Sequence, residues 1–354
     1  MPVPIRAGRP SLLLSLSTSL IPLQPLSLEA RIRWILEGEI PGLVPGPELT
    51  SAEIPLLIRE ASGAGHSVTA LVAPGSDSSS GDSDLRQPIP SLFAIEENER
   101  RHATQSCLQA LAAAEQHEIG VVILSSTNDS AIDQHLDHEK VIEEIGAKKK
   151  STAGETGDPK VARWHEKLQL EQQRRLSDLT RKKAPHPDLQ RKRQDSLLRS
   201  LDAILEQASR RQIQVALRET AEIDGLPQRN SYGEIDEIFR GAPLGLIADP
   251  AAAAVLALLR GQDSVPPLPE GQQLSGFILR DCIGTRSDVL LGDGDLDVEI
   301  QFGQSRADLL RIVEAPPGTE PDRIRKLVRY CREKGLDGNP PPQPGNPFPI
   351  IGTP

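Results

Sequence analysis

Short apolar runs of strand length alternate with longer segments of helical periodicity along almost the whole chain. Eight runs are predicted as strands, at residues 12–17, 42–44, 66–73, 119–124, 213–217, 244–248, 274–279 and 309–313. The segments between most of them place apolar residues at the three- and four-residue spacing of a helix face. Alternation of this kind indicates repeated βα units and a parallel sheet. Eight units in order predict a single (β/α)8 TIM barrel.

The predicted helices begin and end at recognisable residues. Thr50 and Asp195 are expected to be helix N-caps, and Gly335 is expected to close the last helix. The helical segments are predicted at residues 28–36, 54–61, 98–116, 197–208, 235–239, 251–259 and 322–334. We expect one barrel over 1–335, with a basic helical insertion at about 128–193 and a proline-rich tail at 336–354. A doubly wound protein of two domains is the alternative, but no linker separates two halves.

The insertion is the most basic part of the chain. Residues 148–193 hold 14 Lys or Arg against 6 Asp or Glu. A basic face for nucleic acid is one interpretation, and a solvated helical hairpin outside the barrel is the other. We favour the hairpin, because Trp164 is the single aromatic side chain available there for base stacking.

Composition narrows the class of protein. The chain has 354 residues, a net charge of -10, 37% hydrophobic and 3% aromatic residues, so its core must be aliphatic. The negative charge argues against general attraction to nucleic acid or anionic membranes. Three widely spaced cysteines form no metal or redox motif, which favours a reducing, cytoplasmic location. Residues 11–16 are interpreted as the first strand rather than a signal peptide, and no apolar run approaches a membrane span.

Chemistry in a TIM barrel is expected at the carboxyl ends of the strands. Charged residues stand at or after several of the predicted ends: Glu48, Glu219, Asp249, Arg280, Asp281 and Glu314. Glu219, Asp249 and Glu314 are predicted to share one mouth. Like charges in such proximity are costly unless a proton or a cation neutralises them, and a hard divalent ion is a natural occupant.

Structural roles are open for the same residues. Asp249 precedes Pro250, so an N-cap role at the next helix, without any role in a metal site, is an equally good interpretation. A carboxylate at a strand end can equally pair with Arg218 or Arg280. A nucleophilic hydrolase is disfavoured, since Ser125 and Ser126 have no histidine partner in any motif.

Five segments in order and spacing carry a resemblance to a known family. They are Leu217–Thr220, Leu244–Asp249, Gly276–Asp281, Gly292–Asp297 and Ile312–Glu314. Over residues 12–335 the chain resembles the xylose-isomerase-like sugar and sugar-phosphate isomerases and epimerases. The resemblance implies a TIM barrel with Mn or Mg held by two glutamates, an aspartate and a histidine. The glutamates of that family also move a proton between adjacent sugar carbons.

Carried over to this chain, the resemblance implies roles for particular residues. Glu219 and Glu314 would be the catalytic acid/base pair, and would hold the metal together with Asp249. Glu48, Arg280 and Asp281 would bind the sugar.

The sequence departs from the family pattern at two histidines. Their positions fall at Ile278 and Ala252, and all seven histidines precede residue 187. Asp281 or Asp288 could substitute as an oxygen ligand. The metal site is therefore predicted to be partly dismantled.

Three functions remain as hypotheses. The first is a divergent family member with impaired metal-dependent catalysis and a retained pocket for a small sugar or sugar-phosphate. The second is an active isomerase or epimerase that uses Glu219 and Glu314. The third, disfavoured, is a nucleic-acid-binding barrel related to endonucleases, since the C-terminal half lacks the histidines of a multi-zinc cluster. No membrane partner is expected, and the sequence leaves the oligomeric state open.

Overall fold

The strands form one parallel sheet. The structure, a computed structural model, describes residues 14–17, 32, 37, 40–46, 53–73, 91–124, 131–150, 159–223, 225–268, 274–302, 309–316 and 318–337. The nine strands of the sheet are β1 (Leu14–Ser17), β2 (Gly42–Val44), β3 (Ser67–Val68), β4 (Leu71–Val72), β5 (Val121–Leu124), β6 (Gln214–Arg218), β7 (Leu244–Ala248), β8 (Leu274–Leu279) and β11 (Leu310–Val313). Their order is β3-β2-β1-β11-β8-β7-β6-β5-β4, and every neighbouring pair is parallel.

The two outermost strands of this sheet are halves of one chain segment. β3 pairs with β2, β4 pairs with β5, and only Thr69 and Ala70 separate them. The Thr69 N–H still donates to the Leu43 carbonyl, and the Ala73 N–H donates to the Ile123 carbonyl. The predicted third strand is thus interrupted in the middle, and its two pieces bring the edges of the sheet together. The predicted (β/α)8 barrel is confirmed.

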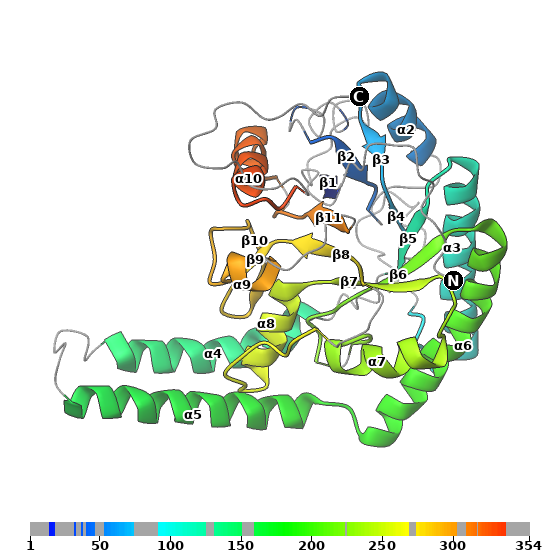
Figure 1. The fold of residues 1–354 in the computed structure, drawn as a ribbon. Coiled ribbons are helices and arrows are strands. Elements are labelled where there is room, and N and C mark those ends of the chain that lie inside the picture. Colours follow the sequence, from blue (N-terminus) through cyan, green and yellow to red (C-terminus); the bar gives the residue numbers. More distant parts are fainter. Residues whose placement is uncertain are drawn as a thin grey trace, which may run out of the picture.

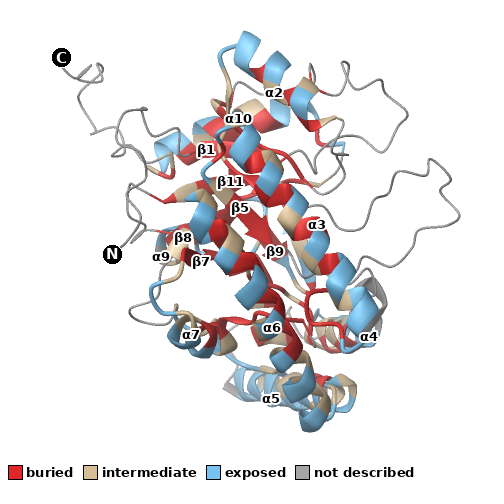
Figure 2. Cartoon of the chain, turned by 90° about the vertical axis from the view of Figure 1, so that its right-hand side faces the viewer, coloured by how far each residue is buried: buried red, intermediate tan, exposed pale blue. Residues whose placement is uncertain are grey.

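Helices surround the sheet and connect its strands (Figure 1). They are α2 (Ile54–Gly63), α3 (Glu97–Gln116), α4 (Ala131–Lys150), α5 (Pro159–Lys183), α6 (Pro187–Arg211), α7 (Arg229–Ile238), α8 (Pro250–Leu259), α9 (Val298–Phe302) and α10 (Pro321–Glu333). A two-stranded antiparallel hairpin, β9 (Asp281–Ile283) with β10 (Arg286–Val289), follows β8. Figure 2 shows the buried strands at the centre and the exposed helix faces outside.

Alternation along the strands separates two apolar layers. One set of strand residues packs outward against the helices, as Leu16, Leu217 and Val313 do. The other set fills the barrel interior with small and branched side chains: Val44, Ala70, Val72, Ile123, Ala216, Ile247, Ile278 and Ile312. Branched aliphatic layers of this kind are the usual filling of a TIM barrel. Because side chains alternate along a strand, the interior set also determines which residues beyond it on each strand face the barrel mouth.

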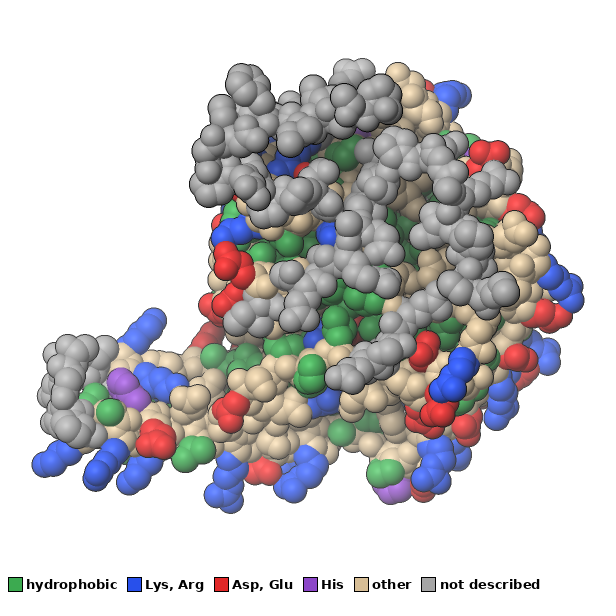
Figure 3. Space-filling model, viewed as in Figure 1, with side chains coloured by type: hydrophobic (Ala, Val, Ile, Leu, Met, Phe, Trp, Pro, Cys, Tyr) green, Lys and Arg blue, Asp and Glu red, His purple; other side chains and the backbone are tan. Residues whose placement is uncertain are grey.

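The predicted insertion contains a pair of long helices that extend away from the barrel (Figure 1). α4 and α5 pack on each other through Val141, Ile145, Leu168 and Leu176. Arg175 of α5 contacts Glu144 of α4 at 2.7 Å. Lys and Arg side chains lie along the outer edge of the pair in Figure 3. The helices thus have a core of their own and present their charges outward.

Two sequence predictions about local structure are wrong. Asp195 lies inside α6 instead of capping it: the helix begins eight residues earlier, after His186, with Pro187 in its first turn. Proline is favoured there because its fixed φ suits the first helical turn and it needs no N–H partner. The β9–β10 hairpin was not predicted, since its strands are short and polar. The prediction that Thr50 caps the helix at 54–61 is wrong, because the N-cap of α2 is Glu53. The predicted helix at 28–36 lies mostly outside the described residues.

The structure bears on two further expectations. Within the described part of the chain, no helix is both long and apolar enough to cross a membrane. Cys107, Cys282 and Cys331 are all buried free thiols.

Gly276 tests the packing of the barrel wall. A Cβ at this position would collide with the backbone carbonyl of Leu310 on β11 and lie 2.9 Å from the Leu310 Cβ. We expect Gly276→Ala to lower the free energy of unfolding by about 1–3 kcal/mol, because the strands cannot separate without losing their hydrogen bonds. Gly120→Ala is the matched control, since a Cβ there meets nothing within 4 Å. Equal urea midpoints for the two variants would contradict this register.

Candidate functional site

Four charged side chains form the layer above the barrel interior. Each lies two residues beyond an interior residue of its strand: Arg218 after Ala216, Asp249 after Ile247, Arg280 after Ile278 and Glu314 after Ile312. Because side chains alternate along a strand, this spacing returns each of them to the inward face. Arg218 is the last residue of β6, and the other three directly follow β7, β8 and β11; the four strands are neighbours in the sheet. We call the four side chains the mouth ring.

The charges in the mouth ring alternate and contact one another in a closed circuit. Arg218 binds Glu314 with both ends of its guanidinium group, at 2.8 and 2.8 Å, and donates to Asp249 at 3.3 Å. Arg280 donates to Asp249 at 2.6 and 3.2 Å and lies 3.5 Å from Glu314. Each guanidinium group therefore contacts both carboxylates, and the ring carries no net charge.

Burial makes these contacts strong. The Asp249 side chain has no exposed surface, and the other three side chains are 13–18% exposed. Burial alone would raise the pKa of Asp249, but Arg280 and Arg218 outweigh it and hold that pKa below its ordinary value. Burial would likewise lower the pKa of Arg218, yet Glu314 and Asp249 raise it overall. Asp249 and Arg218 are thus both stabilised in their charged forms.

Asp249 also has the structural role that its sequence context suggested. Its Oδ1 accepts a hydrogen bond from the Ala252 N–H at 3.0 Å, which caps α8. Ala252, at one of the two family histidine positions, is fully buried, and Ile278, at the other, belongs to the barrel interior. The Asp249 carboxylate thus belongs to the mouth ring and also caps the N-terminus of α8.

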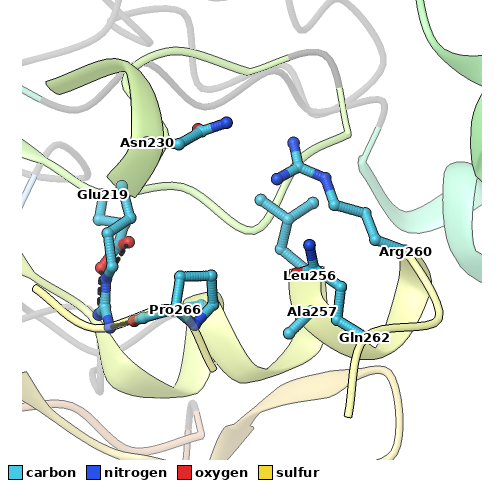
Figure 4. Close-up of a pocket in the computed structure, with 9 residues that line it drawn as sticks. Glu219, Asn230, Leu256, Ala257, Arg260, Gln262 and Pro266 are labelled. Carbon is cyan, nitrogen blue, oxygen red and sulfur yellow. Dashed lines mark hydrogen bonds and ion pairs between the residues drawn. The ribbon is translucent and has the colours of Figure 1, made fainter. Parts of the chain in front are cut away.

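Glu219 lies outside the mouth ring. Arg218, its neighbour, takes the inward position, and the Glu219 carboxylate binds Arg229 of α7 at 2.9 and 2.9 Å (Figure 4). It also accepts the Asp249 N–H at 2.9 Å. Burial raises the pKa of Glu219 more than the contact with Arg229 lowers it. Of the three carboxylates predicted to converge, Asp249 and Glu314 therefore share Arg218 and Arg280, whereas Glu219 is held by Arg229.

Asp281 organises the loop that follows β8. Its carboxylate is fully buried and accepts N–H groups at 2.8–3.1 Å from Cys282, Gly292, Gly294 and Leu296. Gly294 is required because a Cβ there would collide with Asp281, and Gly292 has φ +89. The carboxylate predicted to bind sugar thus has no exposed surface and holds the backbone instead.

Asp288 and Glu48 are the remaining positions predicted from the sequence. Asp288 is exposed and pairs with Arg286 at 3.3 Å. Glu48 lies outside the described residues.

The mouth ring does not fit the divalent metal that the family resemblance implies. No group of three or more His, Cys, Asp or Glu side chains among the described residues is arranged to hold a metal ion. Of the three carboxylates, each is already bound to at least one arginine. The positive charge at the mouth is supplied by Arg218 and Arg280, and a divalent cation beside them would be repelled.

From the sequence, Arg218 is expected only as a possible partner of one carboxylate, and Arg280 either as such a partner or as a sugar-binding residue. The signal for the ring was nevertheless present. Arg218 stands two residues after Ala216, in phase with the inward face of its strand, whereas Glu219 is out of phase. Arg229 gave no such signal, because its contact with Glu219 depends on how α7 packs.

The ring predicts a large cost for removing one anion. Asp249→Asn keeps an oxygen for the α8 cap but leaves two largely buried guanidinium groups sharing a single carboxylate. We expect a loss of about 3–5 kcal/mol in unfolding free energy, measured by urea denaturation. Asp288→Asn, which breaks an exposed pair, should cost less than about 1 kcal/mol. Similar losses in the two variants would show that the ring contributes little.

The lowered pKa of Asp249 also predicts an acid dependence. Its contribution to stability is present above the ordinary pKa of 3.8 and is lost as the pH falls through the lower folded-state value. Wild type should therefore lose stability below about pH 4 more steeply than Asp249→Asn does. Parallel profiles of unfolding free energy against pH would contradict a paired, ionised Asp249.

Comparisons with known proteins agree with this fold. No protein-family model matches the chain, and no curated protein matches its sequence. Among solved structures it is similar to a 3-keto-D-glucoside 4-epimerase from E. coli, with TM-score 0.55 and 13% identity over 90% of this chain and 98% of that one. A D-tagatose 3-epimerase-like protein gives TM-score 0.55 and 12% identity, covering 90% and 96%. A putative xylose isomerase from Rhodospirillum rubrum gives TM-score 0.57 and 10% identity, covering 93% and 99%. The chain thus has the fold of the xylose-isomerase-like TIM barrels, as the resemblance in its sequence implied.

Proposed function

We propose that the chain is a divergent member of the xylose-isomerase-like family that binds a small sugar at the barrel mouth without metal-dependent isomerisation. The bidentate contact between Arg218 and Glu314 carries this proposal. A glutamate whose two carboxylate oxygens both accept hydrogen bonds from one guanidinium group must break that bidentate contact before it can reach a substrate carbon.

The mouth ring supplies donors and acceptors without net charge. The partly exposed Arg218 and Arg280 offer N–H groups, and Glu314 offers oxygens. Sugar hydroxyls both donate and accept hydrogen bonds, so a mixed surface of this kind suits a polyol. Its zero net charge favours a neutral sugar over a sugar-phosphate. Structures similar in fold include a D-psicose 3-epimerase crystallised with D-tagatose, which supports a sugar as the ligand class.

The competing proposal is an active isomerase with Glu219 and Glu314 as the acid/base pair. It requires both carboxylates to reach the reacting carbons of one bound sugar. In the structure they are bound to different arginines, with Glu314 in the ring and Glu219 against α7. Arg218 and Arg229 would both have to release their partners before Glu314 and Glu219 could act.

Divalent metals should not stabilise the wild-type protein. A metal present at a hundred times its Kd would raise the thermal midpoint by about 4 °C for a protein of this size. We expect no such rise with Mn, Mg, Co or Zn, measured by scanning calorimetry on metal-free protein. A reproducible stabilisation that is lost in both Glu219→Gln and Glu314→Gln would favour the active isomerase.

Replacing one of the two arginines of the mouth ring with a glutamate should make the stability of the protein depend on a divalent metal. Arg218→Glu would place a third carboxylate beside Asp249 and Glu314, so that the ring has excess negative charge. We expect this variant to be destabilised by about 3–5 kcal/mol without metal and partly rescued by Mn or Mg. The matched control is Arg286→Glu at an exposed pair, which should respond to neither metal. Failure of every divalent ion to rescue Arg218→Glu would show that Arg218 does not stand in for a cation.

Sugar binding can be measured directly. Saturation-transfer NMR with D-tagatose and D-fructose should show contact with wild type and a weaker signal with Arg280→Ala. An unchanged signal in this variant would place any sugar site away from the ring.

A further inference from the structure

A small pocket lies on the helix side of the barrel wall, between α7 and α8. It has a volume of about 80 Å³. An engineered cavity of about 150 Å³ binds benzene, so this smaller space suits a ligand of a few atoms. Figure 4 shows Glu219 and Pro266 on one side of it and Arg260 on the other. The pocket is therefore separate from the inward-facing mouth ring. Glu219 lines the pocket and also accepts a hydrogen bond from the backbone N–H of Asp249, a residue of the ring.

Arg260 carries a positive charge that no neighbour balances. It is partly buried, and no carboxylate among the described residues lies within ion-pair distance of it. Its guanidinium donates to the neutral Gln228 side chain. Burial lowers the pKa of Arg260, and no nearby anion opposes that effect. A half-desolvated cation without a counter-charge is costly, so the site favours an anion from solution.

The other two charged groups of the pocket, Arg229 and Glu219, do not balance the positive charge of Arg260. Arg229 is neutralised by its bidentate contact with Glu219 and donates a further hydrogen bond to the Pro266 carbonyl at 2.8 Å. The pocket as a whole therefore has an excess charge of one, located at Arg260.

The uncharged lining suits a small oxyanion. The side chains of Asn230 and Gln262 line the pocket and carry amide N–H donors. Ala253, Leu256, Ala257 and Pro266 complete the lining. Asn230 and Gln262 are exposed, whereas Ala253, Leu256 and Ala257 are buried, so the exposed lining of the pocket is polar and its buried lining apolar.

We propose that this pocket binds a small oxyanion, either inorganic phosphate or a carboxylate group, on the guanidinium of Arg260, with Asn230 and Gln262 as further hydrogen-bond donors. Guanidinium geometry matches both classes of oxyanion through paired N–H donors. The proposal is independent of the sugar site, since it uses no residue of the mouth ring.

Titration of the purified protein with sodium phosphate and with sodium acetate tests the proposal, against sodium chloride at matched ionic strength. Isothermal calorimetry should show one site for at least one oxyanion, and the thermal midpoint should rise with that ion beyond the chloride control. The two salts distinguish a phosphate site from a carboxylate site. No binding of either at millimolar concentration would overturn the proposal.

Variants locate the site. Arg260→Gln should weaken binding about tenfold or more, because it removes the charge-assisted hydrogen bonds. Arg260→Lys should retain part of the affinity, and Asn230→Ala should reduce it if the glutamine variant does not fold. Arg240→Gln is the matched control: Arg240 also lies near α7, but its side chain is 80% exposed and already paired with Glu237. Equal affinity in Arg260→Gln and Arg240→Gln would exclude Arg260 as the anion's partner.

Discussion

The mouth of this barrel depends on charge compensation between neighbouring strands. Arg218, Asp249, Arg280 and Glu314 stand in one inward-facing layer, and none of the four has a counter-charge outside the ring among the contacts described. Removing water from one such group is expensive, so the four are stable only together. The ring therefore couples β6, β7, β8 and β11 at the end where a TIM barrel carries its chemistry.

The same ring determines what the mouth can bind. In a barrel with unpaired carboxylates at this layer, a divalent cation would supply the missing positive charge. Here the positive charge comes from the guanidinium groups of Arg218 and Arg280, which are part of the chain itself. The consequence is a polar surface of zero net charge, which can hydrogen-bond a ligand but does not attract a metal.

Much of the fold follows from sequence periodicity. The strands at 42–44, 244–248 and 274–279 were predicted with the observed bounds, because each is a compact apolar run between turn residues. The start of α6 was missed because charged side chains such as Arg191 and Lys192 obscure the helical pattern before Asp195. The interruption between β3 and β4 depends on barrel closure, a tertiary effect that no local pattern records.

The candidate site was predictable only in part. Asp249 and Glu314 could be placed at the mouth because they end strands in phase with the interior, whereas Glu219 required attention to phase as well as position. The pairing of Asp249 with Arg280, and of Glu219 with Arg229, depends on packing between separate segments. Side-chain contacts of this kind decide whether a cluster of carboxylates is a metal site or part of an ion-pair network.

A crystal structure of the protein grown in excess MnCl2, with anomalous diffraction recorded near the manganese edge, tests the central claim most directly. The account predicts an intact Arg218–Asp249–Arg280–Glu314 ring with no anomalous peak between its carboxylates. A manganese ion bound to Asp249 and Glu314, with Arg218 turned away, would contradict it.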